Sequence, residues 1–253
     1  METISLQGID LPYGRMGSGP PLLLLHGGGG PETSFPYAAR LAERFQVIAP
    51  VHPGFGGTSI PEGFNRVDDL VFLYLDLLDA LDLKDAVLMG ASLGGWIAAE
   101  LASMNTTRLS QLFLVGPVGI KTGGREDRDI ADVFALPGEK VAELLFHDPS
   151  LMPTPTNLPD ADLQTIAADR LALGVYTWEP YMHNPKLPRR LHRIKIPVHF
   201  IWGANDGIVS VDYGRKYCAL IAGATMTVIE NTGHVPQIER PDAFVNAVFA
   251  HAQ

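Results

Sequence analysis

Two kinds of hydrophobic pattern alternate along this chain. Runs of three to five mostly apolar residues, closed by glycine, proline or polar residues, suit strands buried on both faces of a sheet. Longer stretches repeat apolar residues every three or four positions, as helices with one buried face do. The predicted strands are residues 22–25, 47–49, 86–89, 112–115, 198–202 and 225–229. The helices predicted between and after them are residues 35–44, 67–81, 93–104, 211–221 and 241–250.

The alternation stops between residues 118 and 192. This stretch has no run that suits a buried strand. It contains proline-rich turns between residues 149 and 159 and helical patterns at about 128–146 and 160–173. Strands that alternate with helices form a mainly parallel sheet covered on both faces. The sequence therefore predicts an α/β core interrupted by a helical insertion.

Length and composition agree with this organisation. A chain of 253 residues, 46% apolar and 19% charged, can form one large domain with a substantial core. We assign residues 1–117 and 193–253 to the α/β core and residues 118–192 to a helical cap or lid.

Charge and targeting signals restrict the partners. A net charge of −9 disfavours nucleic acids and anionic membrane surfaces. The single cysteine, Cys218, allows no disulfide within the chain. The first residues lack the basic and apolar regions of a signal peptide, and no apolar run reaches the ~18–20 residues of a membrane span. We expect a cytoplasmic protein that acts on a small molecule, with no membrane or nucleic-acid partner, and the sequence leaves a homodimer open.

The pentapeptide Gly90-Ala91-Ser92-Leu93-Gly94 lies between a predicted strand and a predicted helix. A strand, G-x-S-x-G and a helix in this order are typical of a nucleophile elbow. Such a turn crowds the backbone, and its glycines let neighbouring chain segments approach closely. The pattern arises easily by chance in a chain with 26 glycines, so the other strand ends must support it. On this basis Ser92 is the candidate nucleophile.

A serine nucleophile needs a base to accept its proton and a third group to orient that base. Reactive groups of parallel sheets follow the carboxyl ends of strands. Asp206 and His234 each follow one of the last two predicted strands, and Ser92, Asp206 and His234 have the chain order of one class of serine hydrolases. Asp212 is the rival carboxylate, but it stands at the start of a predicted helix, where it would serve as a helix-end charge. We predict a Ser92–His234–Asp206 triad.

Acyl transfer also requires N–H donors for the developing oxyanion. One donor is expected from Leu93, directly after the nucleophile, and the other from the glycine-rich loop after the first predicted strand. Gly28 is our choice for the second donor, with Gly27 and Gly29 as rivals. This loop lacks the motifs of nucleotide-binding loops, so we expect no nucleotide cofactor. We interpret His26 as a hydrogen-bonding group of the loop rather than a base.

Several stretches of the chain resemble motifs of the α/β-hydrolase fold superfamily. They are residues 25–29, 50–59, 90–94, 202–206, 233–236 and 239–241. The resemblance implies an eight-stranded, mostly parallel sheet flanked by helices, with a helical cap inserted at residues 118–192. It also implies a Ser-His-Asp triad and neither a cofactor nor a metal.

Within that superfamily, the glycine-rich loop and residues 116–119 are similar to hydrolases that cleave carbon–carbon bonds of ring-cleavage products. The chain departs from them at Val235, where an aromatic residue commonly follows the histidine. The haloalkane dehalogenases and epoxide hydrolases of the same superfamily carry an aspartate nucleophile, so Ser92 argues against both activities.

The substrate pocket is expected beneath the insertion. The residues predicted to line it are Gly27, Gly29, Phe134, Phe146, Trp178 and Val235. A mostly apolar pocket suits an uncharged acyl or aromatic ester. Arg189, Arg190 and Arg193 are candidate anchors for a substrate carboxylate, although solvated surface side chains are the favoured interpretation.

Three functions remain open from the sequence. The first is a serine hydrolase that cleaves carboxylic esters through an acyl-enzyme. The second is hydrolysis of a carbon–carbon bond in a vinylogous diketone by the same triad, which would need a cationic anchor. The third is a non-hydrolytic ligand receptor or a lyase on the same fold.

Overall fold

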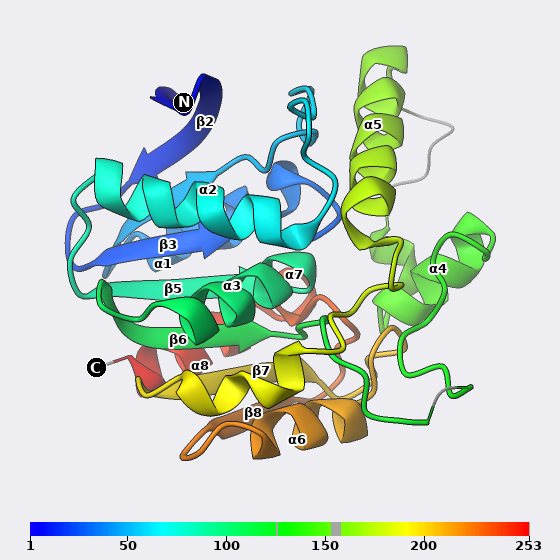
Figure 1. Cartoon of the computed structure of the whole chain (residues 1–253). Helices are drawn as coiled ribbons and strands as arrows, with labels where there is room; N and C mark the ends of the chain where they lie inside the picture. The colour runs from blue at the N-terminus through cyan, green and yellow to red at the C-terminus, as the bar shows by residue number, and fades with distance from the viewer. Residues whose placement is uncertain (125, 153–157, 253) are drawn as a thin grey trace.

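An eight-stranded sheet forms the centre of the molecule (Figure 1). The computed structural model describes residues 1–124, 126–152 and 158–252. The strand order is β1-β2-β4-β3-β5-β6-β7-β8. Strand β2 pairs with β1 and with β4 in antiparallel fashion, and all other neighbours are parallel. The strands are β1 (Glu2–Leu6), β2 (Ile9–Met16), β3 (Pro21–Leu25), β4 (Gln46–Pro50), β5 (Ala86–Ala91), β6 (Leu109–Val115), β7 (Val198–Gly203) and β8 (Thr225–Ile229).

Helices cover both faces of the sheet, with α2, α3 and α6 in front and α1 and α8 behind in Figure 1. Successive residues of a strand point to opposite faces. Accordingly, Leu23 and Leu25 of β3 join the hydrophobic core on the α2 side, while Leu22 and Leu24 join the core on the α8 side. The helices are α1 (Phe35–Leu41), α2 (Val67–Ala80), α3 (Leu93–Met104), α6 (Val211–Ala219), α7 (Pro236–Glu239) and α8 (Pro241–His251). The predicted parallel sheet with two covered faces is confirmed.

The hydrophobic pattern did not predict the edge hairpin formed by β1 and β2. Both strands are half exposed, so neither contains a continuous apolar run. Gln7 and Gly8 join them, with φ angles of 53° and 83°. Two positive φ angles in a two-residue loop form the turn that matches the twist of antiparallel strands.

The insertion at residues 118–192 lies beyond the carboxyl ends of the parallel strands (Figure 1). Its helices are α4 (Gly138–Leu145) and α5 (Asp160–Thr177), and it adds short 3₁₀ turns. These turns are η2 (Pro149–Leu151), η4 (Leu187–Arg189) and η5 (Leu191–Arg193), while η1 (Pro31–Thr33) belongs to the core. Of the predicted proline-rich turns, Pro153 and Pro155 lie outside the described residues.

The predicted helix at residues 128–146 is wrong over its first ten residues. Ile130 instead pairs with Val209 of the core in an isolated β-bridge. The Asp132 side chain accepts hydrogen bonds from the N–H groups of Phe134 and Ala135, which forms a turn in place of a helix. Pro137 disfavours a helical conformation in the residue before it, so α4 begins only after this proline.

The two ends of the insertion meet at the surface of the core. Gly119 N–H donates to Met182 O (2.9 Å), and Asn184 N–H donates to Gly119 O (2.9 Å). The chain therefore leaves and re-enters the core at one place. Within the described residues, no helix combines the length and apolar character needed to cross a membrane.

Candidate active site

Ser92 occupies the turn between β5 and α3. Its backbone has φ 51° and ψ −111°, a conformation that L-residues rarely adopt. A Cβ atom on Gly90 would overlap the Gly94 carbonyl oxygen, and one on Gly94 would overlap the Leu25 carbonyl oxygen. The strand, the turn and the helix meet too closely for larger residues, which is the physical reason for glycine on either side of Ser92.

Asp206 and His234 lie in the loops after β7 and β8 and form a hydrogen-bonded pair. His234 Nδ1 lies 2.8 Å from Asp206 Oδ2, and the two side chains are 4% and 0% exposed. The other carboxylate oxygen, Oδ1, accepts from the N–H groups of Ile208 (2.9 Å) and Val209 (3.0 Å). An ionised carboxylate only accepts hydrogen bonds, so the His234 proton that faces Asp206 sits on Nδ1, and in the neutral imidazole Nε2 presents a lone pair.

Strand β6 brings Ser92 and this pair to one edge of the sheet. Its last residue, Val115, accepts the Ser92 N–H through its carbonyl oxygen (2.9 Å). A Cβ atom on the next residue, Gly116, would lie 3.3 Å from His234 Nδ1 and 3.5 Å from Asp206 Oδ2. His234 Nε2 is buried and hydrogen-bonds to no described residue, Ser92 included. Its lone pair is available to a proton donor at this edge.

The glycine-rich loop lies against the same turn. A Cβ atom on Gly27 would lie 3.5 Å from Ser92 Cβ, and one on Gly28 would lie 2.8 Å from Leu173 of α5. A Cβ atom on Gly29 would instead meet Thr33 at 3.1 Å. Leu93 is the first residue of α3, so its N–H has no acceptor within the helix. Gly27 of the loop and Leu93 of α3 therefore both lie next to Ser92, and the oxyanion donors Leu93 and Gly28 stay a prediction.

Comparisons with known proteins place this chain in a family. The model of the alpha/beta hydrolase family matches residues 22–247. The chain belongs to the alpha/beta hydrolase family.

Related hydrolases span more than one chemistry. The chain is 25% identical to a 2-hydroxy-6-oxo-6-(2'-aminophenyl)hexa-2,4-dienoic acid hydrolase of Metapseudomonas resinovorans, over 98% of this chain and 89% of the relative. It is 26% identical to 3-oxoadipate enol-lactonase 2 of Acinetobacter baylyi, over 98% and 95% of the two chains. The crystal structure of a membrane phospholipase A has the same fold, with a TM-score of 0.83 and 24% identity over 98% of this chain and 84% of that one.

In this hydrolase, two buried histidines support the glycine-rich loop. His52 N–H donates to His26 Nε2 (3.0 Å), so the proton of His26 sits on Nδ1 and donates to Gly27 O (2.8 Å). The two rings stack with centroids 3.7 Å apart. Burial lowers the pKa of His26 to about 4 and that of His52 well below its usual value. Both rings are therefore neutral near pH 7, and His26 Nε2 is already occupied, which suits a loop support rather than a base.

Helix α4 of the insertion contacts both loops that carry the Asp206–His234 pair. The last carbonyl groups of a helix lack partners within it. Here Leu144 O accepts from Gly207 N–H (3.0 Å), and Leu145 O accepts from His234 N–H (2.7 Å). The glycines next to Asp206 and His234 signal a close backbone approach, but the sequence does not reveal that α4 is the approaching segment.

Glu239 at the end of α7 has a role that its local sequence does not indicate. Its Oε2 accepts from the N–H of Gly233, the residue before His234. Its Oε1 accepts from Asp148 N–H (3.0 Å) in the segment after α4. One carboxylate thus joins the histidine loop to the insertion.

The predicted substrate-contacting residues have different environments. Phe146 is buried, and its backbone packs on Gly233 next to the histidine. Phe134 packs edge-on against Trp178 and Tyr181, with ring centroids 6.2 and 6.3 Å away. Trp178 is 65% exposed. Trp178 directly follows the last residue of α5, and its contact with a substrate stays a prediction.

Val235 is half-buried and directly precedes α7. It therefore stands between His234 and the helix that carries Glu239.

The structure does not place the predicted arginine anchors at Ser92. Arg190 Nη1 lies 3.8 Å from Glu100 Oε2, and Arg193 Nε donates to Ser103 O (2.8 Å). Glu100 is eight residues beyond Ser92 on α3, which is about 12 Å along a helix.

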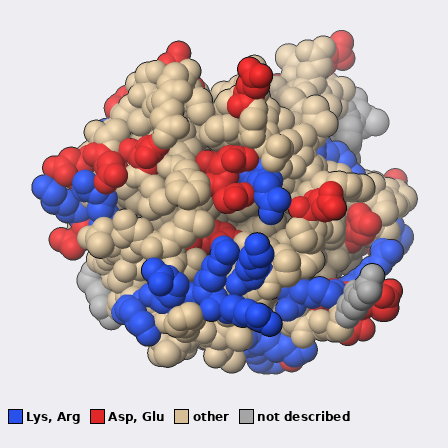
Figure 2. Space-filling model, viewed as in Figure 1, with Lys and Arg blue, Asp and Glu red and all other residues tan. Residues whose placement is uncertain are grey.

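The same arginines belong to a basic stretch, residues 186–195, that has no acidic residue. Figure 2 shows basic side chains gathered on the lower half of the face in view, although the net charge is −9. Arg189 and Arg193 are exposed, and Arg190 is half-buried beside Glu100.

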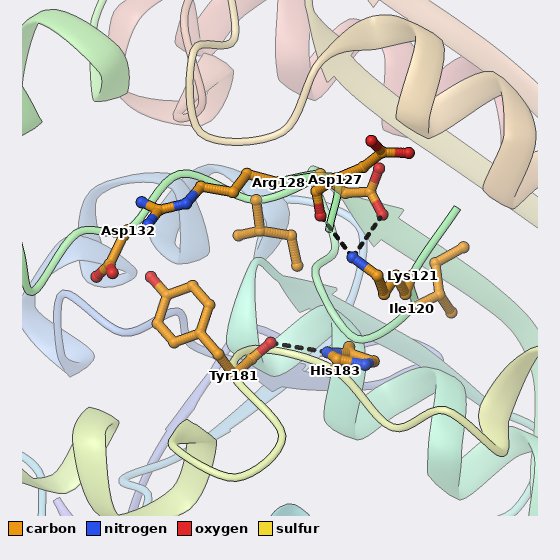
Figure 3. Close-up of a pocket in the computed structure, with 9 residues that line it drawn as sticks. Ile120, Lys121, Asp127, Arg128, Asp132, Tyr181 and His183 are labelled. Carbon is orange, nitrogen blue, oxygen red and sulfur yellow. Dashed lines mark hydrogen bonds and ion pairs between the residues drawn. The ribbon is translucent and has the colours of Figure 1, made fainter. Parts of the chain in front are cut away.

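A polar cavity of about 250 Å³ lies at the base of the insertion (Figure 3). Its lining residues are Ile120, Lys121, Asp127, Arg128, Asp129, Ile130, Asp132, Tyr181 and His183. Lys121 Nζ donates to Asp127 O and lies 4.0 Å from Asp129 Oδ2, so the charges within the cavity partly compensate each other. Ser92, Asp206 and His234 are not among the lining residues. Within the described part of the chain, no group of three or more His, Cys, Asp or Glu side chains could hold a metal ion.

Proposed function

We propose that this hydrolase cleaves carboxylic esters of small, mostly apolar molecules through an acyl-enzyme on Ser92. The observation that carries the proposal is the buried Asp206–His234 pair. His234 Nε2 has no hydrogen-bond partner among the described residues, and it lies at the carboxyl ends of the strands, where the strained turn holds Ser92. A base oriented in this way activates a serine hydroxyl.

The proposed reaction has two halves. In the first, His234 Nε2 takes the Ser92 proton while Oγ attacks the ester carbonyl carbon, and Asp206 stabilises the imidazolium. The N–H groups of Leu93 and Gly28 stabilise the oxyanion, and His234 then protonates the leaving alkoxide. In the second, His234 takes a proton from water, the hydroxide attacks the acyl-enzyme, and Ser92 recovers its proton.

These steps need a small-molecule substrate and water, and no cofactor takes part. The cap boundaries at residues 118 and 192, the cytoplasmic location and the homodimer stay predictions.

Hydrolysis of a carbon–carbon bond is the second candidate. The similarity to the Metapseudomonas resinovorans dienoic acid hydrolase favours it. Ester hydrolysis ranks first because Arg190 and Arg193, two candidate carboxylate anchors, contact Glu100 and Ser103 of α3 instead. The relative from Acinetobacter baylyi is named as an enol-lactonase, and a lactone is an internal ester.

The test combines turnover with covalent labelling. We expect wild type to hydrolyse p-nitrophenyl acetate and to react with a fluorophosphonate probe, with the adduct on Ser92 by mass spectrometry. Ser92→Ala should lose both, whereas the control Ser59→Ala, at an exposed position, should keep both. A folded wild type that neither turns over nor labels would refute the proposal and favour a ligand receptor or lyase. Turnover of a ring-cleavage dienoate without turnover of esters would favour the second candidate.

A further inference from the structure

Helix α5 lies directly on the loop that carries the proposed second oxyanion donor. The two methyl carbons of Leu173 lie 2.8 and 2.9 Å from the position that a Cβ atom on Gly28 would occupy. The leucine side chain therefore covers the backbone of Gly28, and glycine at that position makes room for it.

Two hydrogen bonds fix this face of α5 on either side of Leu173. Asp169 Oδ1 accepts from Gly56 N–H (2.8 Å), and the Tyr176 hydroxyl donates to Pro53 O (3.1 Å). Residues four positions before and three positions after Leu173 lie on the same helix face as Leu173. The leucine is thus anchored to the core one turn above and one turn below.

The strand order tells which part of a bound ester would meet Leu173. The loop of Gly28 follows β3, on one side of β5, while the loop of His234 follows β8, beyond β6 and β7 on the other side. The leaving alkoxide must face His234, which protonates it. The oxyanion faces the N–H groups of Gly28 and Leu93, so the acyl group takes the remaining position at the carbonyl carbon, next to the oxyanion and away from His234.

We propose that Leu173 forms the wall of the acyl site at the oxyanion hole and restricts this hydrolase to esters whose acyl group is unbranched next to the carbonyl. The inference rests on the proposed function. An oxyanion hydrogen-bonded to Gly28 N–H lies about 2.9 Å from that nitrogen. A side chain in contact with Gly28 is therefore adjacent to the first acyl carbons.

The test varies the acyl group while the leaving group stays constant. We measure kcat/KM for p-nitrophenyl isobutyrate and p-nitrophenyl acetate and take their ratio. One methylene group in an apolar pocket changes selectivity about 10- to 200-fold, so Leu173→Ala should raise this ratio at least about tenfold. The control is Leu171→Ala, on the same helix at a position that is 66% exposed, which should change the ratio less than about twofold.

Selectivity for the leaving group distinguishes a specific effect on the acyl site from a general increase in the space of the active site. The ratio of kcat/KM for naphthyl acetate to that for phenyl acetate should stay constant in Leu173→Ala. An unchanged isobutyrate ratio in a folded, active variant, or a change only in leaving-group selectivity, would overturn the inference. If Leu173→Ala does not fold, Leu173→Val carries the same test with a severalfold increase expected. A wild type that hydrolyses none of these esters would overturn the proposed function and this inference with it.

Discussion

The most demanding prediction concerns Asp206→Asn, because the structure determines how the new amide would orient. The Oδ1 position receives two backbone N–H groups, from Ile208 at 2.9 Å and Val209 at 3.0 Å. The asparagine oxygen must occupy that position. In the reverse orientation the NH₂ group would face two N–H donors, and each donor left without an acceptor would cost about 1–3 kcal/mol of stability. In the favoured orientation the NH₂ group points at His234 Nδ1, which must become an acceptor. The imidazole proton moves to Nε2, and the base is lost.

An imidazole held in the wrong tautomer costs about 10⁴-fold in kcat, or about 5.5 kcal/mol of transition-state stabilisation. The assay is kcat for p-nitrophenyl acetate at pH 7, together with ¹⁵N NMR of His234 to identify the protonated nitrogen. Asp212→Asn is the matched control, because Asp212 is exposed and pairs with Lys216 (2.9 Å) on α6, and it should leave kcat within about twofold. A loss below about 100-fold in Asp206→Asn, or a proton that stays on Nδ1, would refute the reasoning.

Two further predictions concern the support of the site and its pH range. Glu239→Ala removes the acceptor of the Gly233 N–H and should lower kcat about 10- to 100-fold at nearly constant KM, because the histidine loop shifts. Equal losses in the exposed control Glu230→Ala would contradict this. Burial lowers the pKa of His26 and His199 from 6.5 to about 4, so each ring resists a proton that the unfolded chain takes up below pH 6.5. Stability is then complete above pH 6.5 and falls as the pH drops to 4, by about 3 kcal/mol for the fully buried His26 and by less for His199, which water partly screens, as urea unfolding measures. His199→Asn should flatten this pH dependence, and an unchanged slope would count against the explanation.

The sequence predicted the parts of the fold that local pattern controls. Strands such as β3 contact a core on each face, so they appear as unbroken apolar runs. The edge hairpin of β1 and β2 has an exposed face and a mixed pattern, and it escaped prediction for that reason. The prediction of a helix over residues 128–146 was wrong at its start, because it was based on apolar spacing alone. Asp132 favours a turn, and Pro137 delays the start of the helix.

In the candidate site, too, some residues could be predicted from local sequence and others could not. Ser92, Asp206 and His234 could be selected because each follows a strand, and a parallel sheet gathers its strand ends at one edge. The contributions of Leu173 and Glu239 could not, since they depend on how the insertion packs against the core. That packing is tertiary, and nothing in the local sequence around these two residues encodes their partners.

The contacts of α4 have a consequence for the evolution and engineering of this hydrolase. Carbonyl groups of the insertion satisfy N–H groups beside both Asp206 and His234, so exchanging the whole insertion for that of a relative would disturb the geometry of the core. A chimaera must retain the segment from Leu144 to Asp148, and any replacement of α5 must keep the hydrogen bonds of Asp169 and Tyr176 to the core. We therefore expect substrate range to diverge through α5, while α4 is constrained as tightly as the loops on which it rests.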